Sequence, residues 1–532
     1  MKINKTLLCT LLLVPVLAIS QPSVDLLIRH ARIIDGTGNP WFYGDISIKA
    51  GRIREVSRHI DSAGAARIID AHGLVAAPGF IDVHTHLEGG LFGGILGHPT
   101  ADNFLFDGVT TAITGNCGGS QTDIAAFFHQ LDSVKVSLNV ATLIGHGSVR
   151  EAVMGRDDRQ PTPEETRRME AMVEQGMRDG AVGLSTGLIY VPGTFAHTEE
   201  VVGLARAAAR YHGVYASHIR NEESQVTQAV EEAINVGRMA SMGVEISHFK
   251  VGGKANWGRS HETLALVEQA RKEGIDVTID QYPYTASSTN LGARLPSWAI
   301  AGTQDSIVSR ISNPAIRKKI ISGMLAEIRR YQFPDFSFAV VASYGADSTF
   351  NGKSITQINR LLGRRAGARQ EAETILDMMV KGGAQMVYHS MNEKDVTYIM
   401  SYPFNMAASD AGVPVQGKGM PHPRAYGTNA RILGRYVREL HVMGLEEAVR
   451  RMSSLPAQKF QLTDRGLLRP GYAADLVIFD PELVTDRATF ENPHQFSTGF
   501  SYVLVNGQVV IEQGKHTGVR SGTPLYGPGY SH

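Results

Sequence analysis

The sequence predicts an α/β fold, namely a TIM-like (β/α)8 barrel with a small β-rich domain built from both chain ends and an insertion before the last barrel strand. Three observations predict it. The middle of the 532-residue chain alternates apolar, β-branched runs with amphipathic segments, which is typical of βα units around a parallel sheet. Eight such runs can be counted, the number that closes a barrel. Both ends carry short strands and turns instead.

The composition fits a globular protein and excludes several classes of function. Hydrophobic residues make up 43% and charged residues 20%, so a packed core is expected and wholesale disorder is not. Lys plus Arg (52) equals Asp plus Glu (52), which argues against a nucleic-acid binder that relies on bulk positive charge. The two cysteines are too few for a disulfide scaffold or a four-cysteine zinc site.

Residues 1–20 have the pattern of a secretory signal peptide. A short basic start precedes an apolar run at 7–17, and small residues stand just before Gln21. The run is about half of the roughly 20 residues that a spanning helix needs, which favours cleavage over a retained anchor. No later segment is long and apolar enough to span a bilayer. We therefore expect a secreted or periplasmic protein in which Cys9 is removed and Cys117 is the remaining cysteine, so no intramolecular disulfide can form.

The two chain ends are expected to form one small domain. Residues 21–76 contain short strands with a hairpin at Ala50-Gly51, and residues 465–532 contain strands that are joined at Asn506-Gly507. Because the ends of a domain often lie close together, the two β-rich regions can pair.

The barrel is predicted over residues 77–464. Its strand candidates are residues 79–86, 109–117, 137–146, 182–190, 214–218, 244–248, 276–282 and 404–410. The gap between the last two is far longer than one helix requires, so we expect an inserted subdomain or lid at about 290–350.

Polar residues stand at the carboxyl ends of several of these strands, which is where the active site of such a barrel lies. His84 and His86 close the first strand and lie two residues apart, so both face the barrel mouth. Taken alone, such a pair fits a metal ion or two structural histidines equally well. Cys117 closes the second strand between glycines, although a lone cysteine is more often a small buried hydrophobe.

Three later strands repeat this arrangement. The fifth ends at Ser217-His218, the sixth at Ser247-His248 and the eighth at Asp410. Packing alone does not explain four histidines, a cysteine and an aspartate that each stand at a strand end. Together they favour a metal site over structural roles.

The order of the motifs resembles the amidohydrolase superfamily, and specifically the N-acyl-D-amino-acid deacylases (D-aminoacylases). The resemblance covers nearly all of the chain after residue 20. Its most specific parts are Asp-Val-His-Thr-His at 82–86, the segments 109–118, 183–190 and 280–288, Ser-His-Ile-Arg-Asn-Glu-Glu at 217–223, Ser-His-Phe-Lys at 247–250, and Pro-His-Pro-Arg-Ala-Tyr-Gly at 421–427. It implies a metal-dependent hydrolase barrel, a small β-sandwich formed by both chain ends, and zinc.

The resemblance also implies a ligand set. Cys117, His218 and His248 would hold the main zinc ion, and a second, weaker site would consist of His84, His86 and Asp410, with Cys117 bridging the two. Many members of the superfamily bridge two metals with a carboxylated lysine on the fourth strand. Residues 183–190 contain no lysine, and the D-aminoacylases use the cysteine of the second strand instead.

The implied reaction is hydrolysis of the amide bond of a small-molecule N-acyl-D-amino acid to a carboxylate and a free D-amino acid. Water activated by zinc would attack the carbonyl carbon, with Asp410 as general base and then as general acid. The resemblance assigns the α-carboxylate of the substrate to Lys250, Tyr282 and Arg424, with Ser288 nearby. The segment from Asp410 to Arg424 is longer than is usual in the family, which leaves the placement of Arg424 open.

Two further arginines each have two possible roles. Arg294 follows the seventh strand and could select an acidic D-side chain, or it could lie on the surface of the insertion. Arg220 follows His218 and could serve the site, or it could form a structural ion pair with Glu222 or Glu223.

Other functions stay open from the sequence. Deaminases of the superfamily usually place a glutamate three residues after the histidine of the fifth strand, where this chain has Asn221. A D-dipeptidase and an enamide hydrolase fit the same motifs, whereas cyclic amidases require the missing lysine. A non-catalytic binding protein on the barrel scaffold typically loses ligands, and all six are present here. The sequence does not predict an oligomeric state.

Overall fold

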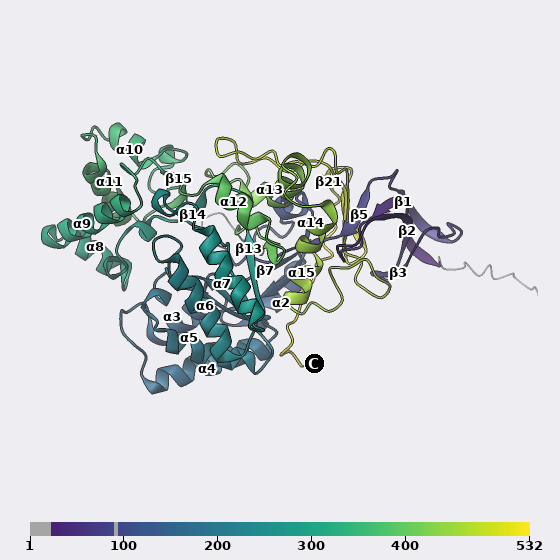
Figure 1. The fold of residues 1–532 in the computed structure, drawn as a ribbon, viewed down its shortest axis with the longest axis horizontal. Coiled ribbons are helices and arrows are strands. Elements are labelled where there is room, and N and C mark those ends of the chain that lie inside the picture. The colour runs from purple at the N-terminus through teal and green to yellow at the C-terminus, as the bar shows by residue number, and fades with distance from the viewer. Residues whose placement is uncertain (1–22, 90–93, 532) are drawn as a thin grey trace, which may run out of the picture.

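The structure is a computed structural model that describes residues 23–89 and 94–531, so the predicted signal peptide lies outside the described residues. The barrel occupies the middle of the molecule (Figure 1). The helices of the insertion lie at one end of the long axis, and the strands that begin the chain lie at the other. Within the described ranges, no helix is long and apolar enough to cross a membrane.

The predicted barrel is confirmed. Its strands are β6 (Phe80–Asp82), β7 (Val109–Thr114), β8 (Asn139–Thr142), β9 (Ile144–Gly145), β10 (Gly183–Gly187), β11 (Val214–His218), β12 (Val244–Ile246), β13 (Val277–Gln281) and β17 (Asn405–Ala407). All neighbours pair in parallel, and β8 and β9 are two parts of the third predicted strand. A parallel bridge between Thr85 and Ala411 joins the first strand to the last. The sheet is therefore closed.

Helices α2 (Ile124–Val134), α3 (His146–Met154), α4 (Pro163–Arg178), α5 (Thr198–Ala209), α6 (Val226–Ala240) and α7 (Ser260–Lys272) follow the barrel strands in the sequence. Helix α4 shows why such segments are helical. Met169, Val173 and Met177 are spaced by four residues, and all three are buried. Thr162 and Glu165 form a capping box that satisfies the first backbone N–H groups of the helix.

The insertion is larger than the sequence predicted. It contains an antiparallel sheet of β14 (Ser287–Asn290), β16 (Gln385–Tyr388) and β15 (Ala339–Ser343), with β16 in the middle. Helices α8 (Gln304–Ser312), α9 (Pro314–Arg330), α10 (Ile355–Leu361) and α11 (Ala368–Val380) pack on a hydrophobic core of its own. Because the central strand is contributed last, the unit ends near Tyr388, and the predicted range of about 290–350 is too short.

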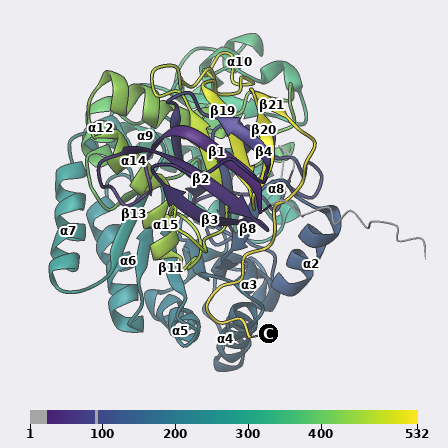
Figure 2. The same ribbon diagram turned by 90° about the vertical axis from the view of Figure 1, so that its right-hand side faces the viewer.

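Both chain ends contribute to one nine-stranded sheet (Figure 2). The N-terminal strands are β1 (Val24–Ile33), β2 (Phe42–Lys49), β3 (Arg52–Ser57), β4 (Ala65–Asp70) and β5 (Val75–Pro78). The C-terminal strands are β18 (Leu476–Phe479), β19 (Phe500–Val505), β20 (Gln508–Glu512) and β21 (Lys515–His516). Strands β5 and β18 join the two groups. The sheet branches at β1, which pairs with both β4 and β5 along one edge.

The region 465–532 is not confined to this sheet. Its last residues run along the amino-terminal ends of the barrel strands, where Leu525 N donates to Val140 O (2.8 Å) and Gly527 N donates to Gly180 O (2.8 Å). The connection between β18 and β19 reaches the opposite end of the barrel, where Asp486 pairs with Arg431 (3.1 Å). The C-terminal region therefore contacts both ends of the barrel.

Candidate active site

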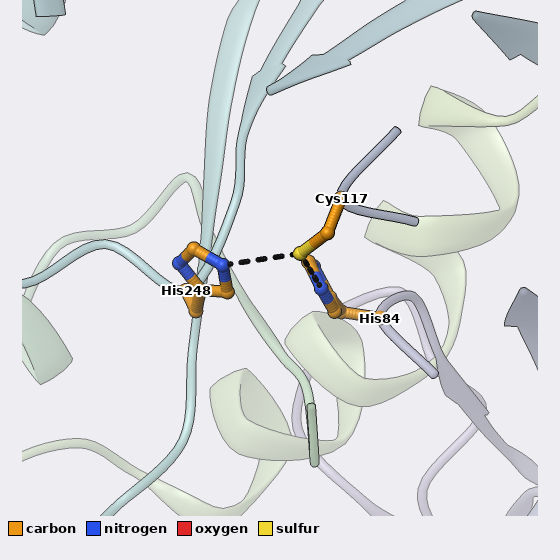
Figure 3. A group of neighbouring side chains, drawn as sticks. All are labelled: His84, Cys117 and His248. Atoms are coloured by element: carbon orange, nitrogen blue, oxygen red, sulfur yellow. Dashed lines mark hydrogen bonds between the residues drawn. The ribbon is translucent and has the colours of Figure 1, made fainter. Parts of the chain in front are cut away.

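Three of the predicted ligands, all histidines, converge on the sulfur atom of a fourth, Cys117. Sγ of Cys117 lies 3.3 Å from Nε2 of His84, 3.5 Å from Nδ1 of His218 and 3.5 Å from Nε2 of His248. Figure 3 shows the rings of His84 and His248 directed at the thiol from different strands. The side chains come from the ends of β6, β7, β11 and β12, as the strand-end pattern predicted.

The other two predicted ligands lie beside this cluster. Nε2 of His86 is 3.1 Å from Oδ1 of Asp410, and Nε2 of His84 is 3.8 Å from the same oxygen. His84 therefore lies between the thiol and the aspartate. All six residues that the sequence singled out as ligands meet at the barrel mouth.

The backbone at three of these positions is unusual. Cys117, His248 and Asp410 have φ values of 53°, 37° and 50°, in the left-handed region that residues other than glycine seldom adopt. Each such residue costs on the order of 1 kcal/mol or more and persists only where the surroundings hold it, as they do at active sites. The glycine at 118 lets the loop that carries Cys117 pack closely against the end of β10, since a Cβ at Gly118 would lie 2.8 Å from the backbone N of Gly187.

The donor atoms fit a zinc ion. Zinc binds nitrogen at about 2.0–2.1 Å and sulfur at about 2.3 Å, so two of its tetrahedral ligand atoms lie about 3.5 Å apart. The three distances from Sγ to the histidine nitrogens match this separation. Three groups among the described residues have their ligand atoms within 4.8 Å of one another: His84, Cys117 and His248; His84, His86 and Asp410; and His218, Glu222 and His248.

The protonation states also fit a metal. Burial raises the pKa of the Cys117 thiol well above its usual range, and the Asp410 carboxylate raises it further. A thiolate at this position therefore requires a cation beside it. Burial lowers the pKa of His218 to about 4 and that of His248 well below its usual value, so both rings are neutral, as metal ligands must be.

Two carboxylates that the sequence reasoning missed support the ligand histidines. Oδ2 of Asp280 lies 3.4 Å from Nδ1 of His84, and its Oδ1 accepts the backbone N–H of His248 (2.7 Å). Oε1 of Glu222 lies 3.0 Å from Nδ1 of His248. Asp280 is the last but one residue of β13 and Glu222 lies four residues after His218, so both positions fall within the motifs quoted above.

The residues expected to bind the substrate carboxylate lie around Tyr282. The guanidinium of Arg424 is 4.5 Å from the centre of the Tyr282 ring, and Nζ of Lys250 is 5.6 Å from it. Arg424 is placed at the site despite the longer loop, and its Nη1 lies 2.8 Å from Oδ2 of Asp410. Ser288 lies nearby, since its carbonyl accepts a hydrogen bond from Nη2 of Arg424 (3.3 Å), while its hydroxyl donates to the carbonyl of Met386 in the inserted sheet (2.8 Å).

Arg294 is not on the surface of the insertion. Its Nη1 lies 3.5 Å from Oε1 of Glu223 and 3.4 Å from Oε1 of Glu327, and its guanidinium is 4.9 Å from the Tyr388 ring. The charge of Arg294 is therefore shared by two carboxylates inside the molecule.

Arg220 has a different partner from the two that the sequence suggested. It forms two hydrogen bonds of 2.9 Å with the carboxylate of Glu232, and it donates to the carbonyls of Thr194 and Ala196. The ion pair with Glu222 or Glu223 is thus a wrong prediction, because helix α6 brings Glu232 to the strand end.

Two adjoining cavities open over the cluster. The first, of about 410 Å³, is lined by His86, Cys117 and Arg424, and the second, of about 480 Å³, extends to Arg294 and Glu327 in the insertion. Asp410 lines both. Volumes in this range hold small molecules. Tyr190, which the sequence reasoning did not select, also lines both cavities, and its ring packs 4.8 Å from that of His218.

Comparison with known proteins places these features in a family. The model of the amidohydrolase family matches residues 67–300 and 368–511, and the stretch between these two ranges lies within the insertion. An N-acyl-D-glutamate deacylase of Alcaligenes xylosoxydans xylosoxydans is 37% identical over 515 residues, which are 93% of this chain and 95% of that protein. A D-aminoacylase of the same organism is 34% identical, with 95% of this chain and 98% of that protein covered.

A solved structure is also similar. The N-acyl-D-glutamate deacylase of Bordetella bronchiseptica, in complex with zinc and a phosphonate inhibitor that mimics the tetrahedral intermediate of the reaction, superposes with a TM-score of 0.80. The two chains are 34% identical, and the match covers 94% of this chain and 99% of that one.

Proposed function

This chain belongs to the amidohydrolase family and is a metal-dependent hydrolase, and we propose that it uses zinc to hydrolyse N-acyl-D-amino acids to a carboxylate and a free D-amino acid. The observation that carries the proposal is the convergence of three histidine nitrogens on Sγ of Cys117 within 3.5 Å. The names of the two relatives and the zinc and phosphonate in the similar structure support the same activity.

We assign the main zinc ion to Cys117, His218 and His248. His84, His86 and Asp410 form the second, weaker site, which adjoins the first because His84 contacts both Cys117 and Asp410. The chemistry that zinc supplies when bound is Lewis acidity, which acidifies water and polarises a carbonyl oxygen.

Asp410 is the proposed general base and acid. Burial raises the pKa of this carboxyl, but Arg424, His248 and His86 lower it by more, so the pKa lies well below its usual range. Asp410 is therefore ionised at neutral pH and can accept the proton of the attacking water. It would then return this proton to the amine that leaves.

Arg424 and Lys250 are the proposed partners of the substrate α-carboxylate. The two cations lie near the same tyrosine ring, at 4.5 Å and 5.6 Å, and both are buried at the edge of the ligand cluster. The planar guanidinium of an arginine matches a carboxylate with two parallel hydrogen bonds. A free α-carboxylate is what distinguishes an N-acyl amino acid from other amides, so this placement supports the proposed substrate class.

The second cavity is the proposed site for the D-side chain, and its charges predict a preference. Glu223 and Glu327 offset the charge of Arg294, so an acidic side chain is disfavoured relative to a neutral one. We expect Glu327→Gln to raise the ratio of kcat/KM for N-acetyl-D-glutamate over N-acetyl-D-methionine by about tenfold, which is ~1.4 kcal/mol. Arg294→Ala should lower the same ratio.

The control for this prediction is Arg317→Ala. Arg317 belongs to the same inserted unit but pairs with Glu373 and Asp377, so its loss should leave the ratio at the wild-type value. If Arg294→Ala also leaves the ratio unchanged, the side chain of the substrate does not meet Arg294.

A further inference from the structure

Glu222 lies in the loop after β11, between two ligand histidines and a substrate-binding lysine. Its side chain is 16% exposed, and its backbone carbonyl accepts the N–H of Gly252 (2.8 Å). This hydrogen bond ties the loop after β11 to the loop after β12. The two loops follow His218 and His248, so the glutamate is held against both ligands.

The carboxylate of Glu222 faces the outer nitrogen of each histidine. Oε1 lies 3.0 Å from Nδ1 of His248, and Oε2 lies 3.9 Å from Nε2 of His218. The other nitrogen of each ring, Nε2 of His248 and Nδ1 of His218, lies 3.5 Å from Sγ of Cys117. Each imidazole therefore lies between the thiol and the same carboxylate.

This arrangement decides which nitrogen carries the hydrogen. A neutral imidazole that binds a metal through one nitrogen has its hydrogen on the other, and that hydrogen needs an acceptor. Nζ of Lys250 lies 2.8 Å from Nδ1 of His248 and can only donate, so it bonds to Nδ1 when this nitrogen carries no hydrogen and cannot serve an Nδ1 that carries one. Nε2 of His218 is buried and has no hydrogen-bond partner within the described part of the chain. Glu222 is the acceptor that both rings face: Oε1 lies within hydrogen-bonding distance of Nδ1 of His248, and Oε2 lies 3.9 Å from Nε2 of His218, just beyond that distance.

We propose that Glu222 is a positioning residue, whose one carboxylate fixes both histidines in the tautomer and orientation that hold the main zinc ion. The same carboxylate accepts a hydrogen bond from Nζ of Lys250 at 2.5 Å, so it also links the zinc ligands to the cation that binds the substrate carboxylate. The inference rests on the proposed zinc site and goes beyond it by assigning a role to a residue that is not a ligand.

The test measures zinc binding rather than turnover. Metal-free wild-type, Glu222→Gln and Glu223→Gln proteins are titrated with zinc in competition with a chromophoric chelator. Loss of an outer carboxylate typically weakens metal binding by roughly 10- to 100-fold, and we expect a loss of this size for Glu222→Gln. Glu223 is the adjacent glutamate but faces Arg294, so Glu223→Gln should stay within about twofold of wild type on the same scale.

Cobalt provides a second readout. Cobalt(II) bound beside a thiolate absorbs visible light, and its spectrum depends on the geometry of the ligands. We expect the spectrum of Glu222→Gln to differ from that of wild type, and the spectrum of Glu223→Gln to match it. If Glu222→Gln does not fold, as judged by circular dichroism, Glu222→Asp takes its place. The shorter aspartate cannot reach both rings, so it too should lose zinc affinity.

Lys250→Met separates positioning from simple charge balance. It removes the cation that contacts Glu222 and His248 but leaves the carboxylate, so its zinc affinity should fall less than that of Glu222→Gln. An equal loss in Lys250→Met and Glu222→Gln would overturn the inference, as would wild-type zinc affinity in the Glu222 variant. A wild-type protein that binds no zinc would overturn the proposed function as well, which keeps the two failures distinguishable.

Discussion

Replacing Cys117 with alanine should release the main zinc ion and abolish hydrolysis while leaving the fold intact. The thiol is the atom on which His84, His218 and His248 converge, and as a thiolate it is the one anion of that donor set. Removing a direct ligand should weaken zinc binding by more than the roughly 100-fold that the loss of an outer partner can cost. Elemental analysis after gel filtration measures the bound metal, and circular dichroism measures the fold.

Ser120→Ala is the matched control for this change. Ser120 lies on the same loop after β7, and its hydroxyl donates to the carbonyl of Gln121 and accepts the backbone N–H of Gly145, with no hydrogen bond to any of the three histidines. This variant should retain zinc and activity. If Cys117→Ala keeps a full complement of zinc and wild-type turnover, the cysteine is a packing residue and the assigned zinc site is wrong.

Asp410→Asn should keep the main zinc ion and lose most turnover. The amide has nearly the shape of the carboxylate but cannot accept the proton of water at neutral pH. Loss of a general base typically lowers kcat by about 10²- to 10⁴-fold, and we expect a decrease in this range at saturating zinc. The measurement is kcat for an N-acyl-D-amino acid, with the zinc content of the same sample.

Asp486→Asn offers a closely matched control. Asp486 pairs with Arg431 at 3.1 Å, and Arg431 lies 4.8 Å from the Tyr284 ring, much as Asp410 pairs with Arg424 beside Tyr282. Neither Asp486 nor Arg431 is a candidate zinc ligand, so Asp486→Asn should retain most activity. Full activity in Asp410→Asn would refute the proposed base, and loss of the main zinc ion would show that Asp410 acts chiefly as a ligand.

The sequence carried most of the information about the ligands. Each of the six follows an apolar strand, and the carboxyl ends of parallel strands meet at one end of a barrel. This rule alone brings His84 and Asp410 together, although they are more than 300 residues apart in the chain. Applying the rule requires only that the strands be recognised in the sequence, and the alternation of apolar runs with amphipathic segments makes them recognisable.

The groups that support the ligands were harder to predict. Glu222 and Asp280 lie within the recognised motifs, but their role depends on which nitrogen of each histidine turns outward, and periodicity does not encode this. Arg220 was assigned the wrong partner because Glu232 reaches it from helix α6, through packing of a helix on the barrel. The end of the insertion was missed because its central strand, Gln385–Tyr388, is contributed last.

The central claim is that the metal centre hydrolyses N-acyl-D-amino acids. A panel of N-acyl-D- and N-acyl-L-amino acids, assayed with metal-loaded and metal-stripped protein and with the zinc content measured, tests it most directly. We predict hydrolysis of the D-compounds only, loss of activity on stripping, and recovery when zinc is restored. Tightly bound zinc without turnover of either series would contradict the claim and favour a binding protein on a barrel scaffold.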